Sequence, residues 1–510
     1  MLRQTLLNFR AYLFLLAAVL GLAARAPAQD LRVATAAFPP SLGNPFTGVN
    51  QPSSELWLSI YDALTYLDWG KDAKPGLALS WENTAPTQWV FHLRPGVTFH
   101  SGKPFTADDV IGTLKLLKSP EGAGYLIAGE TQNIVGFRAL DALTLEITTR
   151  VPDAILPKRL SVMMVVDPDR WQVVGRDGYA REPVGTGPYR LMNWGAGDKN
   201  AALEAFAGSW RRPISVERMQ YRVIIEHNAR LQALISKQVD MATGLLVDDV
   251  ADLQAQGVRT HVQPNPQVKS IALRNLQDGP HPLKDARVRQ ALNYAVDKDA
   301  IATLMMLGYV TPVGQGAPPG LTGHNPEVKP YPHDPVRARA LLAEAGYPNG
   351  ISLSFAVVTA NATPDALIYQ KMAQDLAEVG VKVNLQSITF ADYQSKYASS
   401  NWGAVDAFSQ TWNNAAFQDP IRAVEYFSCL KPNPFFCDPD LVPAIQQVNA
   451  EIDLQKRESY LRALMVRMHD VAPAIWITNA VYVTGYTEKV NRIEILPTGI
   501  TFEKLQLIAP

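Results

Sequence analysis

The sequence has almost no surplus of charge and, beyond its first residues, no long apolar run. Its 47 basic residues stand against 48 acidic ones in a chain of 510. This balance argues against nucleic acid or an anionic membrane surface as a partner. The longest stretch of low polarity, residues 11–24, has 14 residues, whereas a helix needs about 20 to cross a bilayer. The sequence therefore predicts a globular chain, long enough for two or three hydrophobic cores.

The motifs of common catalytic and cofactor sites are also missing. There is no Gly-x-Ser-x-Gly elbow, no His-Glu-x-x-His pair, no phosphate loop ending in Gly-Lys-Ser/Thr and no dinucleotide fingerprint. The eight histidines are scattered, without an i, i+4 pair. Acidic pairs such as Asp108–Asp109 and Asp248–Asp249 fall at expected helix starts, where capping is the favoured role. We therefore expect no catalysis, no metal and no cofactor, although catalytic groups can converge in space from distant parts of a chain.

Cysteine is nearly absent too. Cys429 and Cys437, in the segment SCLKPNPFFCD, are the only two in the sequence. In an exported chain, two cysteines this close are expected to form a disulfide. It would close a short loop and stabilise the fold less than a long-range bridge. A two-cysteine metal site is the alternative, and it lacks a nearby histidine to complete the ligand set.

The N-terminus carries the signature of export. Arg3 and Arg10 accompany the apolar stretch, which is followed by Ala26-Pro27-Ala28, a small-residue cleavage site. Residues 1–28 are therefore predicted to be a cleavable secretory signal peptide. No cysteine lies near the cleavage point, so we expect a released chain without a lipid anchor. Removing residues 1–28 takes away three of the 47 basic residues and none of the 48 acidic ones, which leaves a net charge of −4.

The second half of the chain alternates between helix and strand signals. Asp334 and Pro335 are placed as the N-cap and first residue of a helix. The following segments predict a strand over 351–358, a helix over 365–380 and a strand over 381–388. A strand, a helix and a strand at this spacing form a βαβ unit. The first half is richer in strands and turns, so we expect two lobes with any binding cleft between them.

Seven segments in a fixed order carry a resemblance to a known family. They are YDALTYLD, KPGLALSWE, WVFHLRPGVTFHSGKPFTADDV, PVGTGPYRL, ARLQALISKQVD, PLKDARVRQALNYAVDKDAI and ARALLAEAGYPNG. From about residue 31 to its C-terminus, the chain resembles the extracellular solute-binding proteins of peptide, opine and nickel ABC importers, the family 5 group. The blocks HLRPGVTFHSGKPFTADDV, GTGPY and VRQALNYAVDK are specific in combination.

The resemblance implies an α/β fold of the two-lobed periplasmic-binding-protein class, with mixed sheets and a hinge between the lobes. Lobe I, with an extra subdomain, is expected to hold residues 29–265 and about 480–510, and lobe II residues 266–479. The resemblance also implies a periplasmic protein, expected to be a monomer, that binds a small molecule or a peptide without catalysis. It would deliver this solute to a membrane permease driven by a separate ATPase.

The segment Thr411–Pro420, TWNNAAFQDP, is implied to line the ligand cleft. In relatives that bind dipeptides, an Asp a few residues after the Trp receives the free amino group of the peptide. The matching position here is Ala415 or Ala416. The nearest polar side chains, Asn413 and Asn414, can accept a hydrogen bond but cannot neutralise an ammonium. An unpaired charge in a closed cleft costs about 3–5 kcal/mol, so a simple free-amine peptide is disfavoured unless an acidic residue of the other lobe reaches the site.

Aromatic residues surround this segment. Trp402, Trp412, Phe417 and Tyr426 are equally consistent with packing of lobe II and with flat surfaces for a sugar ring, an aromatic acid or an apolar peptide side chain. Asp419 is expected to shape the turn before Pro420. The loop that follows lacks the histidine of nickel-binding members, which argues against nickel. The candidate ligand contacts are Trp402, Trp412, Asn413, Asn414, Phe417 and Tyr426 of lobe II, with Phe46 and Thr47 carried over from relatives in lobe I.

These observations lead to one expected role with two alternatives. We expect the periplasmic substrate-binding component of an ABC importer, with a peptide or peptide-like solute. Within the same role, a non-peptide solute such as an opine, an oligosaccharide or an aromatic compound is favoured by the missing Asp. A secreted enzyme with a site not visible in the sequence is the alternative of another class.

Overall fold

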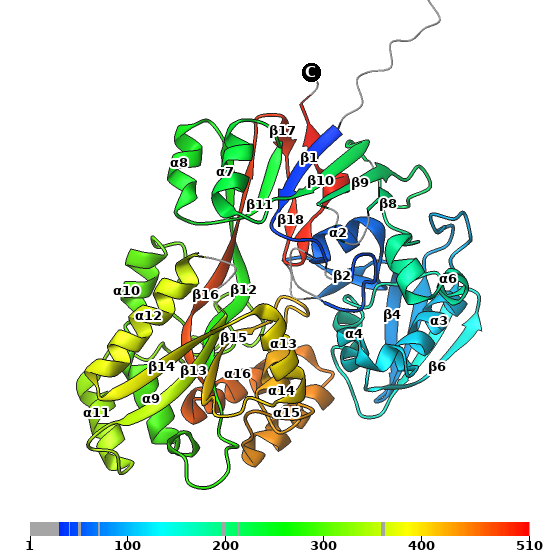
Figure 1. Cartoon of the computed structure of the whole chain (residues 1–510). Helices are drawn as coiled ribbons and strands as arrows, with labels where there is room; N and C mark the ends of the chain where they lie inside the picture. The colour runs from blue at the N-terminus through cyan, green and yellow to red at the C-terminus, as the bar shows by residue number, and fades with distance from the viewer. Residues whose placement is uncertain are drawn as a thin grey trace, which may run out of the picture.

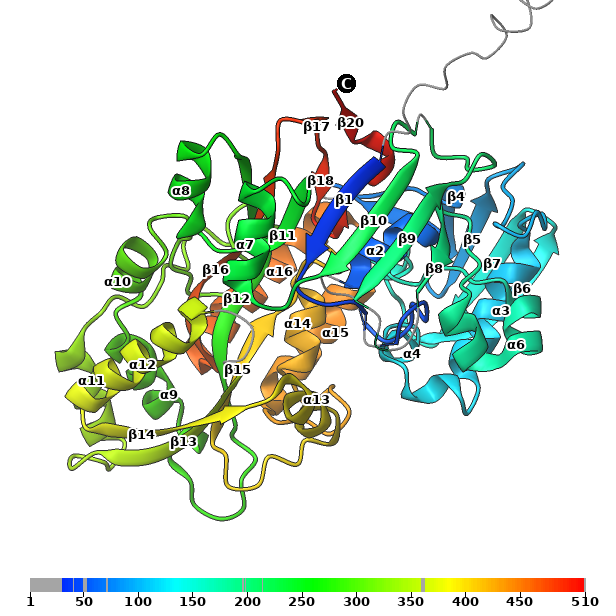
Figure 2. The same cartoon turned by 45° about the horizontal axis from the view of Figure 1, so that its top comes forward.

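The structure of the protein is a computed structural model, which describes residues 30–39, 41–48, 53–69, 72–194, 197, 199–212, 214–358 and 363–508. The expected signal peptide, residues 1–28, lies outside these ranges. Figures 1 and 2 show two lobes joined by the long strands β12 (Arg259–Leu273) and β16 (Ala474–Tyr486). We name the lobes by the expected boundaries, with residues 30–265 and 480–508 as lobe I and residues 266–479 as lobe II.

One ten-stranded sheet runs through both lobes, in the order β14-β13-β15-β12-β16-β11-β1-β10-β9-β8. Lobe II contributes the strands at the β14 end, lobe I those at the β8 end, and β12 and β16 belong to both (Figure 1). The other eight strands are β1 (Asp30–Thr35), β8 (Tyr189–Asn193), β9 (Asn200–Ala205), β10 (Arg218–Val223), β11 (Met241–Leu245), β13 (Ile351–Val358), β14 (Val381–Ile388) and β15 (Ala407–Trp412).

The two crossing strands, β12 and β16, are irregular at the point where they pass between the lobes. They pair antiparallel, and the pairing shifts register between Asn265 and Val268, opposite Ala480 and Asn479. Pro266 lies inside the shifted segment. Because proline cannot donate a hydrogen bond to the neighbouring strand, the regular ladder is broken there. We call residues 265–268 the β12 bulge.

The expected βαβ unit of lobe II is confirmed. β13 and β14 pair in parallel from Ile351 to Val358, and α12 (Thr363–Glu378) connects them. Ile368, Met372 and Leu376 of α12 are all buried, because a spacing of four residues puts them on one helix face. The preceding helix α11 (Pro335–Glu344) is capped by Asp334 as expected.

A separate block of strands and helices extends lobe I and is the expected extra subdomain (Figure 1). Its four-stranded sheet has the order β4-β5-β7-β6. Thr106 N donates to Asp109 Oδ2 (2.8 Å), the reciprocal part of a capping box at the start of α3. The elements are β4 (Ala78–Ala85), β5 (Gln88–Leu93), β6 (Ile134–Asp141), β7 (Thr144–Thr149), α3 (Ala107–Lys118), α4 (Leu126–Glu130) and α6 (Pro168–Arg181).

The remaining elements complete the two lobes. In lobe I they are α2 (Ser53–Ile60), α5 (Leu156–Arg159), α7 (His227–Ile235), α8 (Asp249–Ala255) and the short strands β2 (Thr65–Leu67), β3 (Ala73–Pro75), β17 (Val490–Arg492), β18 (Ile495–Leu496), β19 (Gly499–Ile500) and β20 (Gln506–Leu507). In lobe II they are α9 (Ala286–Ala295), α10 (Lys298–Ala300), α13 (Phe390–Ser399), α14 (Ile421–Tyr426), α15 (Val442–Ala450) and α16 (Leu454–Val471). Among the helices of the described ranges, none is long and apolar enough to cross a membrane.

Two local features stand out, and the first, the disulfide, was expected from the sequence. A disulfide joins Cys429 to Cys437 in the loop after α14, with 4.4 Å between their Cα atoms. The GTGPY segment runs tightly against the end of α2, since a Cβ on Gly185 would lie 2.1 Å from the carbonyl oxygen of Ile60. Only glycine permits so close an approach of two backbones.

Candidate functional site

The two lobes touch through buried charges carried by lobe I residues near α4 and α5 and by α14 of lobe II. Arg422 Nε donates to Glu130 Oε1 (2.7 Å). Arg159 donates to Glu425 Oε1 (3.1 Å) and pairs with Asp153 (3.0 Å). Opposite charges in direct contact avoid the cost of an isolated buried ion. We call these five residues the interlobe charge cluster, and they hold lobe I and lobe II together in this structure.

The segment Thr411–Pro420 continues from β15 toward α14, so it lies in lobe II next to this contact. Asn414 is fully buried, and its Nδ2 donates to the carbonyl oxygens of Pro266 (2.8 Å) and Gly316 (2.6 Å). Its Oδ1 has no hydrogen-bond partner among the described residues. Asn414 therefore ties the segment to the β12 bulge, and its role as a ligand contact stays a prediction.

The two tryptophans near this segment are packed in the core of lobe II. Trp412 lies against Phe427 and Trp476, with ring centroids 4.2 and 4.6 Å away. Trp402 stacks on Phe408 at 3.7 Å. Both tryptophans are at most 1% exposed, so their rings are largely covered by other protein side chains.

The other two aromatic candidates of lobe II flank the interlobe charge cluster. The guanidinium of Arg422 lies 5.7 Å from the ring centre of Phe417 and 5.0 Å from that of Tyr426. Phe417 is fully buried and Tyr426 half-buried. Cation–π contacts of this kind stabilise a desolvated arginine. The structure thus brings both residues to the lobe interface, and contact with a solute stays a prediction for each.

No carboxylate of this segment is free to receive an ammonium. Ala415 and Ala416 are both buried. Asp419 is fully buried and accepts two hydrogen bonds from Arg457 (2.5 and 3.1 Å). Burial acts to raise the pKa of Asp419, but the charges of Arg457 and Lys158 outweigh it and hold the pKa below its ordinary value. Asp419 is therefore a neutralised structural charge that shapes the turn.

The lobe I candidates, Phe46 and Thr47, lie on the loop after β1. Phe46 is fully buried between Tyr125 and Trp171, with ring centroids 6.0 and 5.7 Å away. The Thr47 hydroxyl is hydrogen-bonded to Ser41. The structure places these two residues together, but in lobe I and not among the lobe II candidates.

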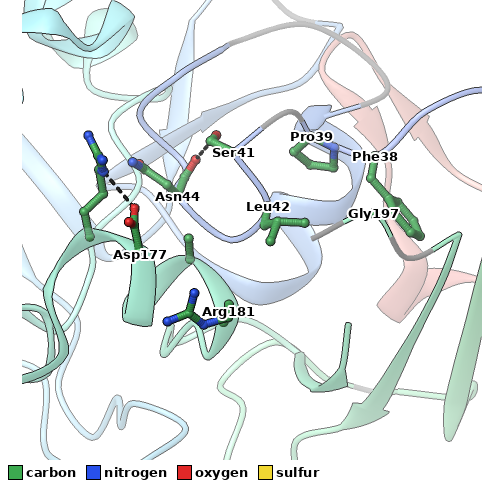
Figure 3. A pocket seen from close by; sticks show the side chains of 10 residues that line it. Phe38, Pro39, Ser41, Leu42, Asn44, Asp177, Arg181 and Gly197 are labelled. Atoms are coloured by element: carbon green, nitrogen blue, oxygen red, sulfur yellow. Dashed lines mark hydrogen bonds and ion pairs between the residues drawn. The ribbon is translucent and has the colours of Figure 1, made fainter. Parts of the chain in front are cut away.

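A pocket of about 480 Å³ opens beside the same loop (Figure 3). Ser41 and Asn44 stand on one side of it, and Asp177 and Arg181 of α6 on the other. Asn44, the one buried polar side chain among the lining residues, already accepts a hydrogen bond from Phe46 N (3.1 Å). The volume is in the range of small-molecule sites, but the described wall presents no buried polar group in need of a partner.

A buried acid that no sequence motif marks is Glu55, in the first turn of α2. Its side chain is buried, and within the described residues it makes no hydrogen bond and no ion pair. Burial raises the pKa of Glu55 to about 8. In the sequence, this residue resembles any acidic residue that favours a helix N-terminus, so no local signal could have revealed it.

A chain of polar contacts runs near Glu55 toward lobe II. Burial and the nearby Glu55 carboxylate raise the pKa of Tyr482 in β16 to about 12, and the Tyr482 hydroxyl lies beside Gln267. Gln267 Nε2, in the β12 bulge, donates to Oδ1 of Asn413 (3.3 Å). The predicted contact Asn413 is thus connected to Tyr482 of lobe I through Gln267 of the β12 bulge.

Comparison with known proteins agrees with this two-lobed arrangement. A family model described as bacterial extracellular solute-binding proteins, family 5 middle, matches residues 72–433. Heme-binding protein A of Haemophilus influenzae is 29% identical over 388 residues, which cover 70% of this chain and 69% of that protein. Glutathione-binding protein GsiB of Shigella dysenteriae serotype 1 is 26% identical over 480 residues, which cover 91% and 92%.

A solved structure confirms the fold. The periplasmic binding protein DppA from Helicobacter pylori, in complex with the peptide STSA, superimposes with a TM-score of 0.82 at 21% identity, covering 94% of this chain and 98% of that chain. Proteins of the matched family are periplasmic and not enzymes, and they work with ABC permease and ATPase components. Because the family model spans most of the sequence, the chain belongs to the bacterial extracellular solute-binding proteins of family 5, the substrate-binding components of ABC importers.

Proposed function

We propose that the solute captured by this chain is a peptide or peptide-like molecule, held between the lobes at the β12 bulge and the segment Thr411–Pro420. The observation that carries this proposal is the match to a glutathione-binding protein over 92% of that protein's length, since glutathione is a tripeptide. A match of this extent includes residues of both lobes.

A non-peptide solute is the second candidate. Ala415 and Ala416 occupy the position where dipeptide-binding relatives place the acidic residue, and Asp419 is neutralised by Arg457. An opine, an oligosaccharide or an aromatic compound would not need that residue. The earlier alternative of a secreted enzyme is set aside, because the family is not enzymatic.

Thermal unfolding with a solute panel tests the proposal. The panel contains glutathione, di- and tripeptides, N-acetylated peptides, opines, oligosaccharides, aromatic acids and heme. A solute at about 100 times its dissociation constant should add roughly 2.7 kcal/mol to the free energy of unfolding. We expect the largest shifts from peptides and glutathione. Shifts confined to sugars, opines or aromatic acids would replace the peptide proposal by the second candidate.

We also propose that residues 1–28 are removed on export and that the mature chain is released as a monomer without a lipid anchor. The apolar stretch and the Ala26-Pro27-Ala28 sequence support this proposal. The intact mass of protein purified from the periplasm should match a chain beginning at Gln29. A mass that includes the first 28 residues, or a lipid adduct, would contradict it.

The lobe boundaries at 265–266 and 479–480 are part of the same proposal. The chain passes between the lobes in β12 and β16, and the register of this pair shifts at these positions. A break in ladder hydrogen bonding lets two strands bend more easily than a regular pair. The β12 bulge and the facing residues of β16 are therefore the place where we expect the lobes to rotate.

A further inference from the structure

We infer that Glu55 receives a cationic group of the captured solute, an ammonium or a guanidinium, where lobe I meets the cleft. This inference rests on the proposed function, because it names a chemical feature of the solute held there. Glu55 would supply, from lobe I, the acidic contact that Ala415 and Ala416 cannot provide in lobe II.

The first support is the isolation of the carboxyl group. Glu55 is 4% exposed, and Gly499 of the β18–β19 hairpin packs against the aliphatic part of its side chain, since a Cβ on Gly499 would lie 3.0 Å from Glu55 Cγ. Among the described residues, the carboxyl has neither a hydrogen-bond partner nor an opposite charge beside it. Two charged residues, Arg211 and Glu503, lie near Tyr189, and they form an ion pair with each other (3.0 Å). A buried carboxyl without a hydrogen-bond partner is costly even in its neutral form, so packing alone does not explain Glu55.

The second support is the aromatic surroundings. Burial and, after it, the charge of the nearby Glu55 carboxyl raise the pKa of the hydroxyls of Tyr482 in β16 and Tyr221 in β10. The Tyr221 hydroxyl is buried and lacks a hydrogen-bond partner within the described residues. A carboxylate beside aromatic rings attracts an ammonium or a guanidinium through charge and through the ring faces.

The third support is the place in the fold. Tyr482 lies beside Gln267 of the β12 bulge, and Gln267 donates to Asn413 at the end of β15. These side chains come from both lobes and meet at the strands that cross between them. A solute that contacts Asn413 from lobe II therefore has the Glu55 carboxyl on the lobe I side of the same junction.

Because the pKa of Glu55 is raised to about 8, binding of a cationic solute should release a proton. At pH 7 the free protein holds the carboxyl in its neutral form. A bound cation favours the carboxylate, so the proton passes to the buffer as the solute binds. A solute without a cationic group leaves the proton in place.

The experiment compares matched probes by isothermal titration calorimetry. The probes are glutathione, dialanine and alanyl-arginine, each with its N-acetylated form. The proteins are the wild type, Glu55→Gln and, as a control in the same lobe with the same charge change, the exposed Glu217→Gln. We expect the wild type to bind at least one cationic probe about 100-fold more tightly than a matched probe lacking that cation. Glu55→Gln should lose most of this preference, and Glu217→Gln should keep it.

A second readout needs only the wild type. Titrations at pH 7 in two buffers of different ionisation enthalpy should show close to one proton released per cationic probe bound, and none for a neutral probe. Binding without any effect of Glu55→Gln on the preference, or without proton release, would overturn the inference and leave the peptide proposal standing. Failure of the wild type to bind any probe would overturn the peptide proposal itself, and the inference with it.

Discussion

At the scale of single residues, Asn414 is a polar side chain whose donors are already used within the fold. Its amide joins the turn after β15 to the carbonyls of Pro266 and Gly316. Asn414→Asp replaces these donors by a buried carboxylate facing two carbonyl oxygens. We expect the free energy of unfolding to fall by about 3–5 kcal/mol, measured by urea denaturation without solute.

Asn413→Asp is the matched control for this prediction. Asn413 is only half-buried, and its Oδ1 accepts a hydrogen bond that a carboxylate can also accept. The free energy of unfolding of the Asn413→Asp variant should therefore change little. Equal losses in the two variants would contradict the structural role of Asn414, and weaker solute binding by a fully stable Asn414→Asp variant would show a direct ligand contact instead.

Glu55 should give the stability of the solute-free protein a visible dependence on pH. The unfolded chain releases this proton near the ordinary pKa of 4.5, whereas the folded chain keeps it to about pH 8. Between these values the folded state binds more protons, so stability falls as pH rises, by at most about 1.4 kcal/mol per pH unit from this group. Glu55→Gln should remove that slope.

The measurement for Glu55 is urea unfolding of the wild type and Glu55→Gln at intervals from pH 5 to pH 8. The difference between the two proteins should grow steadily with pH, in favour of the variant. Glu217→Gln, an exposed substitution in the same lobe, should follow the wild type. Parallel curves for the wild type and Glu55→Gln would show that the carboxyl is not buried in this way.

At the scale of elements, the contact between α4 and α14 depends on one buried ion pair. Arg422 and Glu130 are 7% and 6% exposed. Arg422→Ala leaves the Glu130 carboxylate without its partner, which should cost about 3–5 kcal/mol in stability or drive the lobes apart. We expect a lower urea midpoint or a larger radius of gyration by X-ray scattering. An unchanged midpoint together with unchanged scattering would refute the role of this pair.

The matched control for the interlobe pair is Arg138→Ala. Arg138 pairs with Glu146 between β6 and β7, at the surface (2.6 Å). Exposed pairs are weak because water and salt screen both charges. This variant should therefore unfold like the wild type.

Several individual elements could be predicted from the sequence, because the signals that specify them are local. Asp334 with Pro335 marked the start of α11, and the segments around α12 predicted β13 and β14 in parallel. The close cysteines predicted their own disulfide. In each case the interacting groups lie within a few turns or one βαβ unit, so a short window of sequence contains the information.

At the scale of the whole molecule, the two lobes are joined by β12 and β16, and solute binding should bring them closer. A ligand favours the closed form only through its contacts with both lobes. We therefore expect the radius of gyration of the wild type to decrease on saturation with a solute that shifts its unfolding temperature. Scattering curves that superimpose with and without that solute would show that binding leaves the lobes in place.

The sequence by itself determined the class of protein. A predicted export signal, the absence of catalytic motifs and the family resemblance carried by seven ordered segments indicate a two-lobed solute-binding protein, and the fold and the family confirm this class. These features depend on composition, short motifs and local order, which a sequence displays directly.

Only the tertiary structure decided which polar groups are left without partners. The segment Thr411–Pro420 was predicted to line the cleft, and folding shows Asn414 joined to the β12 bulge and Asp419 neutralised by Arg457. Folding also buries Glu55 near Tyr482, more than 400 residues away in the chain. Burial and pairing of charges depend on residues that are distant in sequence. For that reason the segment Thr411–Pro420, which lacks the acidic residue of dipeptide-binding relatives, could not point to Glu55 in lobe I.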